Sequence, residues 1–267
     1  MPRSLPGSGV AREIRDPADR TRLIGTVPDN VLALLTGDGR TGAALIDDPR
    51  IAGGTDTARR IARDLAARPG PIVPFIAETG GVNTMIVDSS ALAEQVVTDV
   101  LTSAFGSAGQ RCSSLRLLCV QEDAADRILT MLRGAAEMLK IGDPLDPATD
   151  IGPIIDADAK AALEDYAAAM GLPLFELPLP AGTEAGTFFA PRAFQLRAAS
   201  DLRQEVFGPV LHVVRYKAEG LDALLDDIAG SGFGLTLGIH SRIETVQRRI
   251  VGRLRVGNAA LLATDEA

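Results

Sequence analysis

From residue 84 onwards, short apolar stretches alternate with segments of helical periodicity, and this alternation limits the fold more than any other feature of the sequence. Short apolar runs bounded by turn residues are typical of buried strands, and they occur at 84–87, 115–120, 210–216 and 235–239, with a last one near 254–256. Helical periodicity occurs at 91–105, 124–139, 159–170, 220–230 and 242–252. Strands that alternate with helices predict an α/β fold with a parallel or mostly parallel sheet.

The first part of the chain gives weaker signals. Residues 1–30 are polar and rich in Gly, Pro and Asp, with one short apolar piece at 23–27. Helices are predicted at 29–35, 41–47 and 55–67, the last with Thr55 or Asp56 as its N-cap. The prolines within 71–78 indicate an edge strand that leads into a turn at 79–81.

Composition excludes several classes of protein. A chain of 267 residues with 46% hydrophobic content can bury a core, as one large domain or two small ones. The net charge of −8, the absence of tryptophan and an aromatic content of 4% argue against a surface that binds nucleic acid. The sequence contains no apolar run of bilayer length, and its start lacks the apolar core of a signal peptide, so we expect a cytoplasmic protein without a membrane span.

The cysteines and histidines predict neither a disulfide framework nor a metal site. There are two cysteines, and Cys119 lies in an apolar, strand-like run where packing is expected. His212 and His240 also lie in apolar segments, which favours buried histidines over metal ligands. Paired ligands at metal-binding spacing do not occur in the sequence.

Cys112 lies in a different setting. Residues 107–116 read SAGQRCSSLR, a small, glycine-containing and cationic segment. The neighbouring Arg111 favours a thiolate, and Gly109 allows a substrate to approach closely. The residues alone leave two interpretations open, a reactive thiol or a small packed hydrophobic side chain.

Six segments, taken together and in order, resemble the aldehyde dehydrogenases. They are IAETGG from Ile76, SAGQRC from Ser107, DIGP from Asp150, GTFFAP from Gly186, EVFGPV from Glu205 and GLTLGIHS from Gly234. The forms VDSSALAEQVV and GPVLHVVRY are most similar to one branch, the L-glutamate γ-semialdehyde (pyrroline-5-carboxylate) dehydrogenase module of bacterial bifunctional proline utilization A proteins. The resemblance extends from about residue 70 to residue 258.

The resemblance implies a reaction and two catalytic residues. In this family a cysteine thiolate attacks an aldehyde, a hydride passes to NAD⁺, and water releases the acid. By resemblance Cys112 is the nucleophile, and its own backbone N–H is one donor to the oxyanion. Glu78 matches the general base, although the residues alone favour a plain acidic residue at a strand end. The implied activity is the NAD-dependent oxidation of an aldehyde, above all of L-glutamate γ-semialdehyde to glutamate in proline catabolism.

The same resemblance implies binding residues and partners. Glu205 matches the residue that holds the nicotinamide ribose, Phe207 the residue beside the nicotinamide, and Gly80 a position in the cofactor site. Ser113 matches a position that helps to hold the substrate carboxylate. The expected cofactor is NAD, and the expected partners are a small aldehyde substrate, a second copy of the chain or a proline dehydrogenase.

The sequence also departs from the family pattern, and we expect a shortened, internally deleted copy with weak or no NAD-dependent turnover. Between residues 27 and 28 it lacks the opening strands of the dinucleotide fold, an Asn that gives the second oxyanion donor, and a Lys that contacts the adenosine ribose. Near Gly53 it lacks the turn that would hold the pyrophosphate. The expected organisation is a remnant of the NAD-binding domain at 1–77, a nearly complete catalytic α/β domain at 78–258, and a tail at 259–267.

Two further functions remain open. One is a noncatalytic aldehyde-dehydrogenase-like domain that serves assembly, although such a domain would have no need of both Cys112 and Glu78. The other is a thiol-dependent hydrolase or acyl-transfer enzyme that works without NAD.

Overall fold

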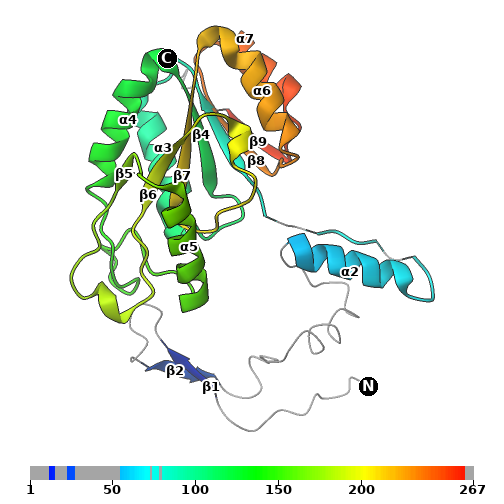
Figure 1. Cartoon of the computed structure of the whole chain (residues 1–267), viewed down its shortest axis with the longest axis vertical. Helices are drawn as coiled ribbons and strands as arrows, with labels where there is room; N and C mark the ends of the chain where they lie inside the picture. Colours follow the sequence, from blue (N-terminus) through cyan, green and yellow to red (C-terminus); the bar gives the residue numbers. More distant parts are fainter. Residues whose placement is uncertain (1–11, 16–22, 28–54, 73, 78–79, 262–267) are drawn as a thin grey trace. The chain divides into compact units, whose positions relative to one another are not determined.

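Parallel strands form the centre of the structure, as the alternating pattern predicts (Figure 1). The computed structural model describes residues 12–15, 23–27, 55–72, 74–77 and 80–261. The chain divides into two units, and the described residues up to Gly80 belong to the smaller one, while those from Gly81 onwards belong to the larger one.

The larger unit contains a seven-stranded sheet with the order β5-β6-β7-β4-β3-β8-β9. All neighbouring strands are parallel except β5, which pairs antiparallel with β6. The strands are β3 (Asn83–Val87), β4 (Leu115–Gln121), β5 (Phe175–Glu176), β6 (Arg192–Leu196), β7 (Val210–Tyr216), β8 (Thr236–His240) and β9 (Asn258–Leu261). The α/β fold class and four of the predicted strands, β3, β4, β7 and β8, are therefore confirmed.

The central strands are apolar on both faces because helices cover both. Every residue of β3 and β4 is buried, as is typical of parallel sheets. The helices are α3 (Ala93–Phe105), α4 (Glu122–Ala136), α5 (Ala157–Met170), α6 (Leu221–Gly230) and α7 (Glu244–Arg253), which confirms the five that are predicted here. The chain moves one way along the sheet through α3 and the other way through α6 and α7, so right-handed crossovers place these helices on opposite faces (Figure 1). No helix in the described part of the chain is long and apolar enough to cross a membrane.

The last predicted strand is wrong in position. Residues 254–256 are extended but make no ladder, and the strand is β9, which pairs with β8 from Thr236 and Asn258 onwards. The N–H of Leu254 still bonds to the carbonyl of Ile250 at the end of α7, and the N–H of Gly257 bonds to Gly234. The chain therefore begins to pair with β8 only after these two backbone hydrogen bonds have been made.

The described part of the smaller unit contains an antiparallel pair of strands and one helix. They are β1 (Arg12–Arg15), β2 (Leu23–Val27) and α2 (Thr55–Ala67), and α2 confirms the helix predicted at 55–67. The predicted helices at 29–35 and 41–47 lie outside the described residues. The predicted strand at 71–78 is wrong, because its described residues, 71–72 and 74–77, form no strand. Pro71 and Pro74 lack the N–H groups that a ladder requires, and Ile72 and Ile76 are exposed.

Both histidines are buried strand residues, as their apolar surroundings predict. His212 on β7 makes two hydrogen bonds, through Nδ1 with the carbonyl of Arg116 at 2.9 Å and through Nε2 with the hydroxyl of Tyr166 at 2.8 Å. A carbonyl can only accept, so Nδ1 carries the proton and Nε2 accepts from Tyr166. Burial lowers the pKa of His212 to about 4. His212 is therefore neutral in the folded protein at pH 7.

This histidine makes the stability depend on pH. Its pKa is about 4 when folded and 6.5 when unfolded, so between these values the unfolded chain binds more protons. The contribution is complete above pH 6.5 and is lost as the pH falls towards 4, a loss of up to roughly 3 kcal/mol. Urea unfolding between pH 4 and pH 7 is expected to show a steeper fall in stability for the wild type than for His212→Gln. Equal slopes in the two proteins would contradict the assignment.

Candidate active site

The segments that carry the predicted site residues meet at the amino edge of the parallel sheet. Gly81 precedes β3, Cys112 precedes β4, and Glu205 precedes β7. Since β7, β4 and β3 are neighbours and run in the same direction, their amino ends lie together. Glu78 lies outside the described residues, and Gly80 is the last residue of the smaller unit.

Cys112 lies in a turn and is exposed. The turn runs from Arg111 to Ser114, closed by a hydrogen bond from the N–H of Ser114 to the carbonyl of Arg111 at 3.1 Å. The N–H of Cys112 makes no hydrogen bond with the described part of the chain, which leaves it able to donate to an oxyanion. Cys119, in contrast, is fully buried in β4, and burial raises the pKa of its thiol. The exposed thiol is thus the one that the resemblance identifies.

The loop before Cys112 has an unusual backbone. Ser107, Ala108 and Gly109 follow one another with φ values of 56°, 52° and 63°, in the left-handed region that residues other than glycine rarely adopt. Gln110 then fixes the loop, because its side-chain amide donates to Pro153 at 3.1 Å and accepts from the N–H of Ile155 at 2.9 Å. Backbone strain of this kind persists only where the surroundings hold it in place.

Asn83 holds the same loop from the side of β3. Its buried amide nitrogen donates to the carbonyls of Cys112 at 2.6 Å and Ser114 at 2.8 Å, and its oxygen accepts from the N–H of Thr236 at 3.1 Å. One side chain therefore joins the thiol turn, β3 and the start of β8. Sequence reasoning missed this residue, and an asparagine at the start of an apolar run is the only sequence signal for it.

Glu205 and Phe207 lie in the segment that leads into β7. Glu205 Oε1 is buried, and no donor in the described part of the chain makes a hydrogen bond to it. Phe207 is 46% exposed, unusual for a large apolar side chain. Oε1 lies 3.6 Å from Arg116 Nη2 but accepts no hydrogen bond in the described part of the chain. A carboxylate oxygen that is free to accept, and an exposed ring two residues along the chain, fit the ribose hydroxyls and the flat ring of a nicotinamide nucleotide.

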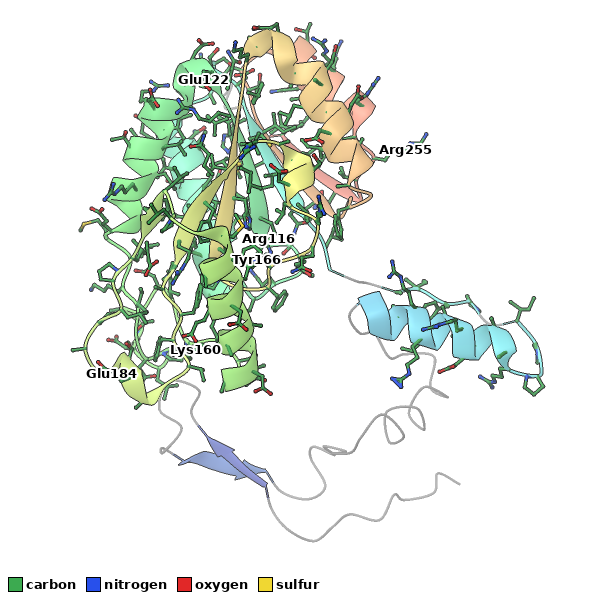
Figure 2. The ribbon with its side chains drawn as sticks, viewed as in Figure 1. Arg116, Glu122, Lys160, Tyr166, Glu184 and Arg255 are labelled. Atoms are coloured by element: carbon green, nitrogen blue, oxygen red, sulfur yellow. The ribbon has the colours of Figure 1, made fainter. Side chains whose placement is uncertain are left out.

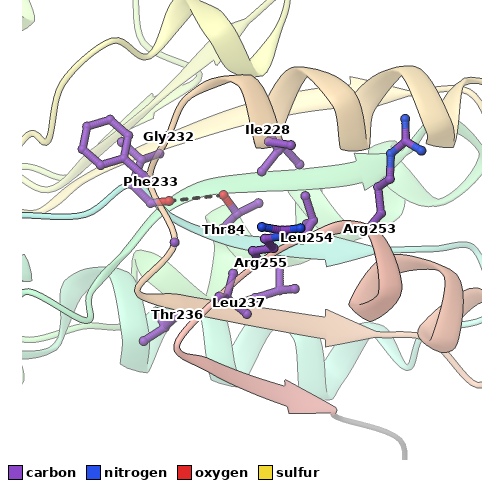
Figure 3. A pocket seen from close by; sticks show the side chains of 13 residues that line it. Thr84, Ile228, Gly232, Phe233, Thr236, Leu237, Arg253, Leu254 and Arg255 are labelled. Atoms are coloured by element: carbon purple, nitrogen blue, oxygen red, sulfur yellow. Dashed lines mark hydrogen bonds between the residues drawn. The ribbon is translucent and has the colours of Figure 1, made fainter.

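Ser113 lines a cavity beside the sheet. This cavity, of about 340 Å³, is also lined by Asn83 and Arg111 and extends across β3 and β8 towards α3. Another cavity, of about 300 Å³, lies between the sheet and the segments that follow α6 and α7 (Figure 3). Its lining includes Phe233 and Arg255 but neither the thiol nor Glu205, so it is separate from the predicted site.

The charged groups described in the structure do not form a metal centre. Among the residues that the structure describes, no three His, Cys, Asp or Glu side chains lie close enough to share a metal ion.

Comparisons with a family model and with known proteins agree on one family. The family model described as "Aldehyde dehydrogenase family" matches residues 21–263. The chain is 47% identical over 269 residues to a bifunctional protein PutA of Klebsiella aerogenes, with 91% of this chain and 20% of that protein covered. It is 32% identical over 247 residues to a 1-pyrroline-5-carboxylate dehydrogenase of a Geobacillus strain, with 87% of this chain and 47% of that protein covered.

The fold agrees with a solved structure. A mutant of proline utilization A from Bradyrhizobium japonicum superposes with a TM-score of 0.80 at 52% sequence identity, and the match covers 89% of this chain and 25% of that one. The chain thus spans about a fifth to a quarter of the bifunctional proteins and about half of the dehydrogenase. Family model, relatives and fold lead to one conclusion: this chain belongs to the aldehyde dehydrogenase family.

Proposed function

We propose that this site oxidises an aldehyde through Cys112 with NAD⁺ as the oxidant, and that the aldehyde is L-glutamate γ-semialdehyde. The observation that carries the proposal is the exposed thiol in a turn whose carbonyls are fixed by Asn83, at the same sheet edge as a buried Glu205 oxygen that accepts no hydrogen bond in the described part of the chain. The substrate follows from the relatives, which are named as PutA and 1-pyrroline-5-carboxylate dehydrogenase.

Different residues of the chain carry out different steps of the proposed reaction. The Cys112 thiolate attacks the aldehyde carbon, and the new oxyanion accepts a hydrogen bond from the N–H of Cys112. NAD⁺ supplies the acceptor for the hydride that leaves this carbon. The acyl group then remains on the sulfur as a thioester, and water, activated by Glu78 as the general base, releases the acid and the free thiol.

The remaining roles rest on the family resemblance. Ser113, exposed beside the thiol, binds the substrate carboxylate, while Glu205, Phe207 and Gly80 contact the cofactor. The names proline utilization A and 1-pyrroline-5-carboxylate dehydrogenase support a place in proline catabolism. The proposed location in the cytoplasm and the proposed association with a proline dehydrogenase or a second copy of the chain rest on the resemblance.

The direct test is NAD⁺ binding by the purified chain, measured by calorimetry. We expect a Kd below the millimolar range for the wild type, and a loss of about 10-fold or more for Glu205→Gln, because a hydrogen bond to a charged acceptor is lost. Glu244→Gln is the matched control, since Glu244 pairs only with Arg248 on the surface of α7. Affinity in the control should equal that of the wild type.

The outcomes separate the candidate functions. Millimolar or absent binding in the wild type would reject NAD-dependent turnover by this chain. In that case, cleavage of a nitrophenyl ester that depends on Cys112 would favour a thiol hydrolase. No ester cleavage would favour a noncatalytic domain.

A further inference from the structure

Arg116 is a buried cation at the centre of the candidate site. It lies on β4, four residues after the thiol, and its side chain is fully buried (Figure 2). Burial lowers the pKa of Arg116, but an arginine remains charged at any pH at which the protein is folded. A buried charge is costly unless hydrogen bonds and an opposite charge compensate it. The groups that contact its guanidinium therefore indicate the role of Arg116.

The guanidinium contacts two segments that are far apart in the sequence. Nη2 donates to the carbonyl of Arg111, next to the thiol, at 3.1 Å. Nη1 donates to the carbonyl of Gly208 at 2.9 Å. The opposite charge comes from Glu205, whose Oε1 lies 3.6 Å from Nη2, and the ring centroid of Phe207 lies 5.5 Å from the guanidinium carbon.

The two segments also touch each other directly. A Cβ placed on Gly109 would lie 2.1 Å from the carbonyl oxygen of Gly208, so glycine is required where the thiol loop meets the segment that precedes β7. Arg116 donates to that same Gly208 oxygen. Both the close approach and the buried cation therefore fix the separation of the thiol and Glu205.

We propose that Arg116 is a positioning residue that couples the Cys112 turn to the Glu205–Gly208 segment, so that nucleophile and cofactor-binding side chains keep one fixed relation. The cofactor part of this role rests on the proposed function, whereas the coupling of the two segments does not. Arg116 does not contact the reacting atoms in this arrangement. It acts through the carbonyls, the carboxylate and the ring that it holds.

The coupling is tested by amide hydrogen exchange in the full chain. Arg116→Lys keeps the charge but offers a single nitrogen, which cannot reach both carbonyls and the carboxylate in the planar geometry of a guanidinium. Exchange is expected to rise about tenfold in both 106–114 and 203–210, the effect of losing a hydrogen bond to a charged group. Exchange in α4 should remain at the wild-type rate.

A matched arginine serves as the control. Arg215 also lies on a parallel strand and pairs with carboxylates, Glu122 and Asp126, but it lies at the far end of β7. Arg215→Met should leave exchange in 106–114 and 203–210 unchanged. Arg116→Met, if it folds, should exceed the effect of Arg116→Lys.

The result can overturn the proposal in two ways. A rise confined to 106–114 would mean that Arg116 supports the thiol turn alone, and a rise of equal size in α4 would mean that it only supports the fold. For the cofactor part, Arg116→Lys is expected to weaken NAD⁺ binding about tenfold, while Arg215→Met leaves it at the wild-type value. If the wild type does not bind NAD⁺, the proposed function fails, but the exchange comparison still decides the coupling.

Discussion

Replacement of Cys112 with alanine is expected to abolish the chemistry of the site, with a loss of about 10⁴-fold or more in aldehyde oxidation or ester cleavage. The physical reason is that no other thiol can replace it, because the sequence contains only one more cysteine, Cys119, which is fully buried in β4. The measurement is the initial rate with each substrate, alongside the labelling of free thiols by iodoacetamide in the native protein. Labelling should fall from one thiol per chain to none.

The control for this variant is Cys119→Ala. It should keep both the activity and the single reactive thiol, and should lose only about 1 kcal/mol of stability from a small cavity in the core. Activity that survives in Cys112→Ala would refute the nucleophile assignment. Native labelling of two thiols in the wild type would contradict the burial of Cys119.

Gly109→Ala is the substitution with the largest expected effect on stability at the site. Alanine would have to adopt a φ of 63°, and its Cβ would lie 2.1 Å from the Gly208 carbonyl oxygen, so the two segments must separate. The left-handed conformation and the overlap together are expected to lower the free energy of unfolding by about 2–5 kcal/mol. Urea unfolding measures this loss, and NAD⁺ binding should weaken with it.

Gly182→Ala isolates the effect of the contact. Gly182 has a φ of 92° and a ψ of −5°, in the left-handed region, and a Cβ there would meet no atom within 4 Å. This control variant should therefore lower the free energy of unfolding by about 1–2 kcal/mol, from the left-handed backbone alone and without the overlap. If the two alanine variants were equally stable, the close approach of the thiol loop to Gly208 would not matter.

The helices and central strands were predictable because their patterns are local. The apolar runs of β3, β4, β7 and β8 and the periodicity of α3 to α7 each extend over enough residues to identify the element. The predictions were wrong where backbone hydrogen bonding, and not the apolar pattern, decides whether and where a strand forms. Pro71 and Pro74 remove the donors of an apolar run, and β9 begins only after the hydrogen bonds of Leu254 and Gly257 are satisfied.

The candidate site was predictable as a set of residues and not as an arrangement. Cys112 and Glu205 were proposed from short motifs that resemble those of the family. Asn83 and Arg116 were not, because their roles consist of hydrogen bonds to backbone carbonyls, which any sequence supplies. Such contacts leave almost no signal in a single sequence.

The sequence by itself determined the α/β class, the identity of the exposed thiol and the family, since all of these depend on residue types and on spacing along the chain. Only the tertiary structure decided that the thiol turn, Glu205 and Asn83 share the amino edge of one sheet, because parallel strands bring together segments that lie up to about 120 residues apart. It also decided that Arg116 joins two of them. A buried guanidinium needs hydrogen bonds and an opposite charge to compensate its own charge, and only the folded sheet places those partners around it.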